Sequence, residues 1–499
     1  MFALILSLLL GLAGFYLEAW PRFKNRYFGI DTWRFALLAD QIRRHHRLPL
    51  SVPERYIVPG SVDNPPFLYW LLSLFPKSFV DRHQGLFSPA FDVLHGLTLF
   101  AAGWYISGTP WVGLLAQAIY LVTPVTPLEA SNLSLRTFSS LIVTWTMLGL
   151  MAYLVDPAPW KAGLAIGLVC LVAYTHRMSL QVIFFTFFTL TLFDGERTYL
   201  LIFLPGVALA IFGFKAKYLE YLRGQLLLVA FWMYNIHNRL AHMTRGLPSR
   251  KAMPVDFVRK IEFFIQKIPI LPLFAVNPWL TFVLWRFYEQ PELVQPHFVA
   301  SWSPLLIKWA LALFFLSWLF NLRYLRFLGE GQRYLEYAGS AVALIAAQLV
   351  YRSLTGLSPL WIAPLAGLGA LACVVLVVLM QYKLVVNNPD KSITEPLWRI
   401  IEHMKAQNNP RIACIPHGLS DAFAYFMENG QTLLSDNSVG VYELVDFWPL
   451  MQKTPDQLAA KYGLTHLLLS TGYAQPDELD LSNWRLERQE GQYLLFVKT

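Results

Sequence analysis

Long apolar runs dominate the first 385 residues of the chain. They lie near residues 1–20, 88–107, 110–127, 136–154, 160–176, 178–193, 198–214, 268–286, 303–321, 338–352 and 357–382. Several reach or approach the ~20 residues that cross a ~30 Å hydrocarbon core. In lipid, only helices satisfy their own backbone hydrogen bonds without closing into a barrel. The pattern therefore predicts a polytopic α-helical membrane protein with about eleven spans.

Three segments break this pattern. A long first loop covers residues 21–87 and a basic second loop covers 215–267, in which 224–236 is short enough to favour a re-entrant or interfacial helix. Residues 386–499 are typical of a soluble α/β domain, since strand-like runs at 411–416, 465–470 and 492–499 alternate with helical segments at 420–429 and 454–462. Each of these helical segments begins with a Ser or Thr suited to an N-cap.

Composition supports the membrane assignment. The chain is 56% hydrophobic and 14% charged, with a mean hydropathy of +0.43, whereas a soluble domain carries about 25% charged residues. The first run has no cationic n-region and no convincing cleavage site, so we interpret it as a retained membrane helix. The formal charge of +8 comes from scattered Lys and Arg residues, which argues against nucleic acid binding.

An odd number of spans places the two ends of the chain on opposite sides of the membrane. Both long loops and the C-terminal domain then share one face, which is periplasmic or extracellular if the N-terminus is cytoplasmic. The short loop 322–337 would lie on that face although it carries Arg323, Arg326 and Arg333, against the positive-inside rule. Either the orientation is inverted, or these arginines hold a phosphate group, which is the interpretation we favour.

The first loop contains a carboxylate at the membrane edge. The sequence Gly29-Ile30-Asp31 leads into a helix expected from Trp33 to Arg44. A carboxylate at that depth is costly unless it binds a cation or takes a proton, although Asp31 is equally suited to be a simple helix cap. Further along the loop, paired prolines precede an aromatic helix that begins at Phe67.

This order of features resembles the GT-C membrane glycosyltransferases. The resemblance rests on a long first helix, then G-x-D and a short basic helix, then a polar-Pro-Pro-aromatic turn. It implies a multi-span helical fold, a soluble domain on the active-site side and a polyprenyl-phosphate-linked sugar donor. It also implies that Asp31 is the general base or a metal-associated carboxylate, and we assign the nearby Arg34 to substrate binding.

Many relatives have a second acidic residue, and the candidate here is Glu129 in the segment 126–137. An ordinary loop carboxylate is the alternative. Because Thr32 rather than an acid follows Asp31, a divalent cation (Mg or Mn) held by Asp31 and Glu129 is possible but not implied. The doubled His45-His46 and the pair His237 and His242 have no acidic neighbours, so we interpret them as solvated or membrane-facing.

Two further groups of residues suit phosphate binding. His176 and Arg177 join two apolar spans, and an arginine there offers a planar donor fork; a snorkelling arginine is the alternative. The segment 329–337 contains Arg333, Tyr334 and Glu336. The resemblance makes Arg333 the ligand of the carrier phosphate, whereas its spacing from Glu336 fits an ion pair equally well.

These inferences combine into one functional prediction. The chain is predicted to be an inverting glycosyltransferase that moves a hexose or pentose from a polyprenyl-phosphate carrier to a glycan, lipid or protein acceptor. We place it in a bacterial inner membrane with its site facing the exterior, in contact with membrane lipids and without nucleic acid. The competing interpretations are a flippase for lipid-linked glycans and a non-catalytic scaffold of envelope assembly.

Overall fold

The computed structural model describes residues 1–29, 31–47, 51–58, 60, 62–238, 276–289, 302–322, 324–329, 331–435 and 437–499. His242, Arg323 and parts of the segments 215–267 and 268–286 lie outside this range. The chain forms two compact units. The helical unit comprises Met1–Lys24, Gly85–Ala216 and Ile268–Leu384, and the sheet unit comprises Asn25–Gln84, Lys217–Lys267 and Val385–Thr499.

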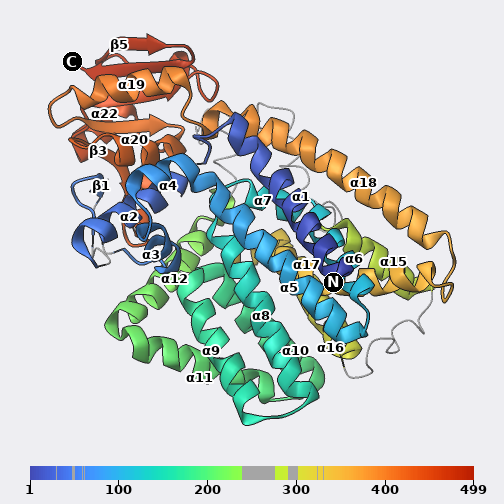
Figure 1. Ribbon diagram of the computed structural model, residues 1–499. Helices are drawn as coiled ribbons and strands as arrows, with labels where there is room; N and C mark the ends of the chain where they lie inside the picture. Colours follow the sequence, from blue (N-terminus) through green and yellow to red (C-terminus); the bar gives the residue numbers. More distant parts are fainter. Residues whose placement is uncertain are drawn as a thin grey trace. The chain divides into compact units, whose positions relative to one another are not determined.

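The described part of the helical unit consists of helices (Figure 1). They are α1 (Phe2–Lys24), α5 (Phe87–Ser107), α6 (Pro110–Val122), α7 (Val125–Ala130), α8 (Leu135–Val155), α9 (Pro159–Thr175), α10 (Arg177–Asp194), α11 (Thr198–Phe214), α15 (Pro278–Glu289), α16 (Ser303–Asn321), α17 (Gln332–Leu354) and α18 (Ile362–Gln381). The main packing pairs are α5 with α6, α8 with α9, α6 with α17, α16 with α17 and α9 with α11.

Where they are described, the predicted apolar runs lie on these helices, with shifts of a few residues at the ends. The run 110–127 is divided between α6, which ends at Val122, and α7, which begins at Val125. Six helical segments among the described residues have the length and hydropathy to cross a membrane: Phe2–Lys24, Lys77–Ser107, Leu135–Val155, Arg177–Asp194, Ser303–Asn321 and Ile362–Val386. Three shorter apolar helices accompany them. The chain is an integral membrane protein. The segment predicted as a short interfacial helix belongs to α12 (Ala216–Tyr234), which is longer than the apolar run suggested.

The sheet unit mixes helices from the first loop with an α/β core. Besides α12, its helices are α2 (Asp31–His45), α3 (Phe67–Ser73), α4 (Lys77–His83), α19 (Glu395–Lys405), α20 (Ser420–Phe426), α21 (Gly440–Glu443) and α22 (Pro455–Tyr462). Its strands are β1 (Tyr56–Val58), β2 (Arg411–Ile415), β3 (Gln431–Ser435), β4 (His466–Ser470), β5 (Trp484–Glu490) and β6 (Tyr493–Lys498). The predicted strands and helices of the C-terminal segment are therefore present.

The six strands form one sheet in the order β1-β3-β2-β4-β6-β5 (Figure 1). The pairs β1–β3, β3–β2 and β2–β4 are parallel, while β6 pairs antiparallel with both β4 and β5. The edge strand β1 comes from the first loop, more than 370 residues before its partner β3 in sequence, with Tyr56 opposite Thr432. The first loop is therefore part of the C-terminal sheet, which the sequence-based domain boundary at 385/386 did not include.

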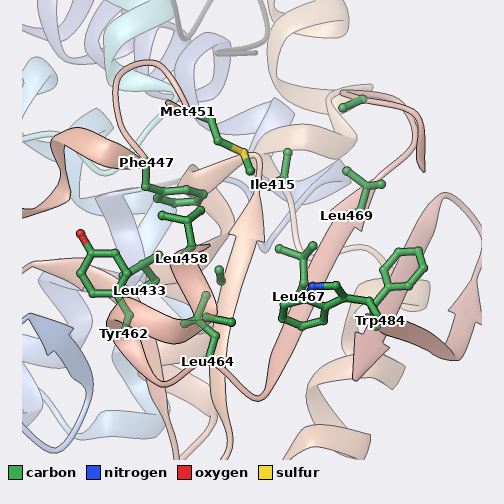
Figure 2. Close-up of a cluster of buried hydrophobic side chains, with 14 of the residues drawn as sticks. Ile415, Leu433, Phe447, Met451, Leu458, Tyr462, Leu464, Leu467, Leu469 and Trp484 are labelled. Atoms are coloured by element: carbon green, nitrogen blue, oxygen red, sulfur yellow. The ribbon is translucent and has the colours of Figure 1, made fainter. Parts of the chain in front are cut away.

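One face of the sheet carries a continuous hydrophobic core (Figure 2). Alternate residues of the central strands point into it, as a strand period of two requires: Ala413 and Ile415 from β2, and Leu467 and Leu469 from β4. Helix α22 covers these residues with Leu458, Ala459 and Tyr462. Thr454 caps α22 by accepting a hydrogen bond from the Gln457 N–H at 3.3 Å, and the Gln457 side-chain oxygen accepts one from the Thr454 N–H at 3.1 Å.

Helix α2 packs on α20 through aromatic side chains. The indole of Trp33 is 1% exposed and lies 5.7 Å from the Tyr425 ring and 4.8 Å from the Phe426 ring. Aromatic pairs at this spacing contribute about 0.5–1.5 kcal/mol each beyond the area they bury. The start of α2, where Asp31 lies, is thus anchored to the C-terminal α/β core within one unit.

Candidate functional site

An ion-pair triad lies in the helical unit where α7, α8 and α17 meet. Arg136 Nη2 is 2.9 Å from Glu129 Oε2, and Arg136 Nη1 is 3.0 Å from Glu336 Oε1. The three side chains are 14% to 25% exposed, so they are accessible at one side and desolvated at the other. The structure therefore brings together Glu129 and Glu336, which sequence reasoning had singled out separately, through an arginine it had not considered.

Local structure fixes the geometry of this triad. Ser134 is the N-cap of α8 and accepts a hydrogen bond from the Arg136 N–H at 3.1 Å. The Ser134 hydroxyl also donates to Glu129. A Ser cap at this position is favoured because the first N–H groups of a helix have no partners within the helix. One cap thus orients both Arg136 and the carboxylate at the end of α7.

Three arginines converge near the junction of α9 and α10. Arg136, Arg333 and Arg177 all act electrostatically on His176, whose Nδ1 is shielded from solvent. Desolvation, together with these three positive charges, lowers the pKa of His176 well below its usual value, so the ring is neutral at pH 7. The predicted phosphate ligands Arg177 and Arg333 are therefore gathered with the triad, in the helical unit.

Glu336 and Tyr334 both have contacts that link α17 to other helices. Glu336 forms an ion pair with Arg136 on α8, and Arg333 on its own helix also acts on it electrostatically. Tyr334 is fully buried, and its hydroxyl accepts a hydrogen bond from Gln181 Nε2 at 2.8 Å. Its ring packs 4.8 Å from Phe320, so in this structure it joins α16 to α17.

In the sheet unit, Asp31 is the exposed first residue of α2. A carboxylate in the first turn is stabilised by the helix dipole, which is compatible with a chemical role. Both Asp31 and the half-buried Arg34 act electrostatically on Asp421, in the first turn of α20. Asp421 is 6% exposed and accepts a hydrogen bond from the Tyr56 hydroxyl at 3.3 Å.

The environment of Asp421 shifts its titration. Burial, reinforced by the negative charge of Asp31, raises the pKa of Asp421 to about 7, against the opposing effects of Arg34 and the Tyr56 hydroxyl. Asp421 thus changes charge near neutral pH beside an exposed carboxylate. Such shifts are concentrated at functional sites, although structural networks also produce them. Sequence reasoning missed Asp421 because an acid in the first turn of a helix is ordinary.

Comparison with solved structures identifies the fold. The structure matches the apo crystal structure of an oligosaccharyltransferase from Archaeoglobus fulgidus with a TM-score of 0.59 and 12% identity, over 94% of this chain and 69% of that one. It matches ArnT from Cupriavidus metallidurans bound to undecaprenyl phosphate with a TM-score of 0.54 and 11% identity, over 99% and 98% of the two chains. Both proteins have the GT-C fold. This chain has the GT-C fold.

A third match supports the same conclusion. The archaeal oligosaccharyltransferase AglB from Archaeoglobus fulgidus, in complex with an inhibitory peptide and a dolichol-phosphate, aligns with a TM-score of 0.56 and 12% identity, over 94% of this chain and 69% of that one. No protein-family model matches the sequence, and no curated protein matches it. At this level of identity the likeness establishes the architecture, and the roles of residues have to be argued from this chain.

The sequence analysis considered a divalent cation bound by Asp31 and Glu129. The described residues contain no group of three or more His, Cys, Asp and Glu side chains arranged to hold a metal ion, and a cation at Asp31 and Glu129 stays a prediction. The chemistry below is assigned to side chains of the chain.

The GT-C helical unit also contains a buried polar network that sequence reasoning did not select. Asp92 accepts a hydrogen bond from the Tyr120 hydroxyl at 2.9 Å, and the same hydroxyl lies 2.6 Å from His95 Nδ1. Glu18 on α1 is fully buried and acts on Asp92. Ionisable residues within membrane helices are rare and costly. The sequence signal for this network is the presence of Glu18, Asp92 and His95 within apolar runs.

Proposed function

We propose that this protein is an inverting glycosyltransferase that uses a polyprenyl-phosphate-linked sugar. The observation that carries the proposal is the convergence of Arg136, Arg177 and Arg333 around His176 in a GT-C fold. Against these three cations the same cluster holds two carboxylates, Glu129 and Glu336. A single additional phosphate would therefore be nearly neutralised. Two structures with this architecture are described as bound to undecaprenyl phosphate and dolichol-phosphate.

The proposed reaction is a direct displacement. The acceptor hydroxyl attacks the anomeric carbon, the bond from that carbon to the phosphate oxygen breaks, and the bonding electrons leave with the phosphate. Asp31 takes the proton of the hydroxyl as general base, a role worth about 10²–10⁴-fold in rate. One displacement inverts the anomeric configuration. The exposed position of Asp31 at the start of α2 makes its carboxylate available for this proton transfer.

Arg177 and Arg333 are proposed to bind the departing phosphate. Fixed cations that face a developing negative charge lower the barrier because they need not reorganise during the reaction. Arginine suits this task because its planar fork can donate two parallel hydrogen bonds to phosphate. The neutral His176 can add an uncharged hydrogen bond, while Glu129, held by Arg136 and Ser134, is proposed to orient the sugar.

The proposal extends to the cellular setting. The donor and acceptor would meet at the extracytoplasmic face of a bacterial inner membrane. The acceptor would be a glycan, a lipid or a protein, and the transferred sugar a hexose or a pentose. The loop Arg326 and the site residue Arg333 then lie outside because they serve phosphate binding, which answers the conflict with the positive-inside rule.

The test is transfer by the purified full-length protein in detergent with radiolabelled polyprenyl-phosphate sugars. Wild type should release or transfer sugar, with inversion seen by NMR of the product, and Asp31→Asn should lose about 10²–10⁴-fold in turnover. Asp477→Asn is the matched control, since Asp477 is also an exposed acid in the first turn of a short helix of the sheet unit. Full turnover by Asp31→Asn would remove Asp31 from the reaction.

The alternatives predict other results in the same assay. A flippase would bind the donor lipid and move it across reconstituted vesicles without cleaving the sugar–phosphate bond. A scaffold would show neither turnover nor translocation. Specific donor binding without turnover by any sugar would therefore refute the transferase proposal.

A further inference from the structure

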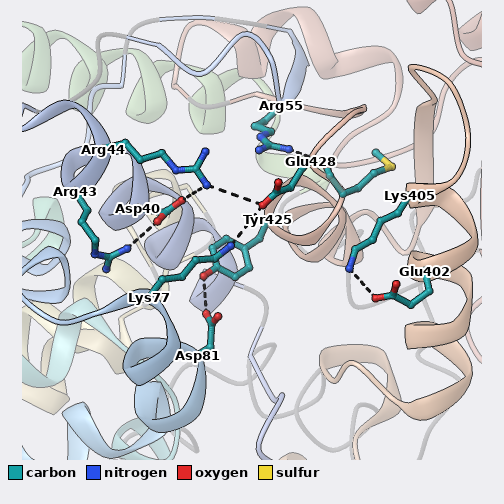
Figure 3. A network of polar contacts seen from close by, with 11 residues as sticks. Asp40, Arg43, Arg44, Arg55, Lys77, Asp81, Glu402, Lys405, Tyr425 and Glu428 are labelled. Carbon is teal, nitrogen blue, oxygen red and sulfur yellow. Dashed lines mark hydrogen bonds and ion pairs between the residues drawn. The ribbon is translucent and has the colours of Figure 1, made fainter.

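The sheet unit contains a cavity of about 420 Å³ between α4 and α20. Its walls are formed by Lys77, Asp81, Lys405, Tyr425, Phe426 and Glu428, together with Asn429. Figure 3 shows how most of these side chains gather from three separate segments of the chain. The volume lies in the range of ligand-binding clefts, about 300–1,000 Å³. No residue of this cavity belongs to the chemistry assigned above.

The polar groups of the cavity are already balanced in charge. Lys77 Nζ lies 3.6 Å from Glu428 Oε1, and Lys405 Nζ lies 2.6 Å from Glu402 Oε1. Asp81, the second carboxylate of the wall, accepts a hydrogen bond from the Tyr425 hydroxyl at 2.5 Å. A multiply charged anion would have to displace the carboxylates from both lysines. The electrostatics therefore favour a ligand without net charge.

The same groups offer donors and acceptors side by side. Lys77 and Lys405 donate, whereas Glu428, with a side chain 64% exposed, accepts. The Asn429 amide is held by its Nδ2, which donates to the carbonyl oxygens of Lys405 and Gln407 at 3.0 Å and 2.6 Å. The side-chain oxygen of Asn429 is a further hydrogen-bond acceptor in the wall. A ligand that both donates and accepts at neighbouring positions, as vicinal hydroxyl groups do, fits this arrangement.

An aromatic ring completes the wall. Phe426 is half-buried, with Trp33 at 4.8 Å and the Trp398 ring in an edge contact at 5.0 Å. These neighbours hold the ring in one orientation, so its free surface is presented at little entropic cost. A rigid apolar surface beside fixed hydrogen-bonding groups matches a molecule with one C–H face and hydroxyl groups around its edge.

We propose that this cavity binds an uncharged sugar residue of a glycan. The C–H face of the pyranose packs on Phe426, and its hydroxyl groups exchange hydrogen bonds with Glu428 and the two lysines. The inference concerns binding and holds whether or not the protein transfers sugar. If the proposed function holds, the bound sugar belongs to the acceptor, because Tyr425 and Phe426 of α20 both line this cavity and pack on α2, which begins at Asp31.

The test measures protection of lysines in the full-length protein. Lys77 and Lys405 are 39% and 35% exposed at the side chain, so an amine-acetylating reagent can reach both. Labelling is followed by peptide mass spectrometry in the presence of a panel of methyl glycosides and, separately, of inorganic phosphate. Lys453 and Lys461, 40% and 41% exposed in the same unit, are internal controls because they lie outside the cavity.

We expect at least one methyl glycoside to slow labelling of Lys77 and Lys405 several-fold, with no change at Lys453 or Lys461. Glu428→Gln keeps the shape of the exposed side chain and should weaken this protection about tenfold, as expected for losing a hydrogen bond to a charged group. Protection by phosphate alone would overturn the proposal in favour of an anion site. Unchanged labelling with every glycoside would overturn it outright. Because the assay involves no turnover, neither result bears on the transferase proposal.

Discussion

The triad of Glu129, Arg136 and Glu336 allows a quantitative test of the helical unit. The perturbation is Arg136→Gln, which removes the cation and leaves two facing carboxylates without their partner. Breaking a fully buried ion pair by deleting one member costs about 3–5 kcal/mol. Because the three side chains keep 14% to 25% exposure, water offsets part of that loss, and we expect a destabilisation of about 2–3 kcal/mol.

The magnitude can be separated from general damage by a double-mutant cycle. Glu336→Gln alone leaves Arg136 with Glu129, 2.9 Å away, so its cost should be smaller. In the double variant Glu336 is no longer charged, so it cannot repel Glu129 once Arg136 is removed. The stability lost by the double variant should therefore be smaller than the sum of the two single losses by about 1–2 kcal/mol. Stability is read from the unfolding midpoint when a mild detergent is titrated with a denaturing one.

A control pair sets the scale for this cycle. Lys161 and Asp156 are 2.5 Å apart in the same unit, but Asp156 is 75% exposed at its side chain, and such pairs couple by about 0.2–1 kcal/mol. If Arg136 and Glu336 couple no more strongly than this control pair, the triad is not an energetic unit. The triad would then not hold Glu129 in place for a sugar.

Three further predictions concern the sheet unit. The folded-state pKa of Asp421, about 7, lies above the ordinary value of 3.8. Between these two values the folded state keeps a proton that the unfolded state has lost, so the free energy of unfolding falls as the pH rises. Asp421→Asn should flatten that fall in thermal unfolding between pH 4 and 8. Thr454→Ala removes the cap of α22 and should cost about 1 kcal/mol, seen as faster hydrogen exchange of the α22 amides. Leu467→Ala, at a site 1% exposed in the core, should cost about 2–5 kcal/mol by denaturant unfolding, whereas Leu486→Ala, 47% exposed, should cost within about 0.5 kcal/mol.

Local signals in the sequence predicted local structure well. The apolar runs gave the membrane helices because the length of hydrocarbon to be crossed sets the length of the run. The Thr454-Pro-Asp-Gln457 segment is a capping box, and α22 begins there. The paired prolines before Phe67 marked the start of α3. Strands β2, β4 and β6 were found because each is a short apolar run bounded by turn residues.

Contacts between distant segments were beyond such reasoning. Strand β1 is three residues long and pairs with β3 from the far end of the chain, and so short a strand has no periodicity to detect. Arg136 resembles any arginine near a helix start, and only the folded chain shows it between Glu129 and Glu336. Asp421 was hidden for the same reason. The acidic and basic residues that were predicted are those that stand out from the residues next to them in the sequence.

Because the first loop is incorporated into the C-terminal sheet, the C-terminal segment also positions residues of that loop. Asp31 begins α2, and α2 is held through Trp33, which packs against Tyr425 and Phe426 of α20. A segment placed after the last membrane helix thereby fixes the conformation of a carboxylate placed after the first one. If Asp31 is the general base, its orientation depends on a domain without a catalytic sequence motif. Substitutions in the β2–β4 core should then lower turnover, although no residue of that core is proposed to contact a substrate.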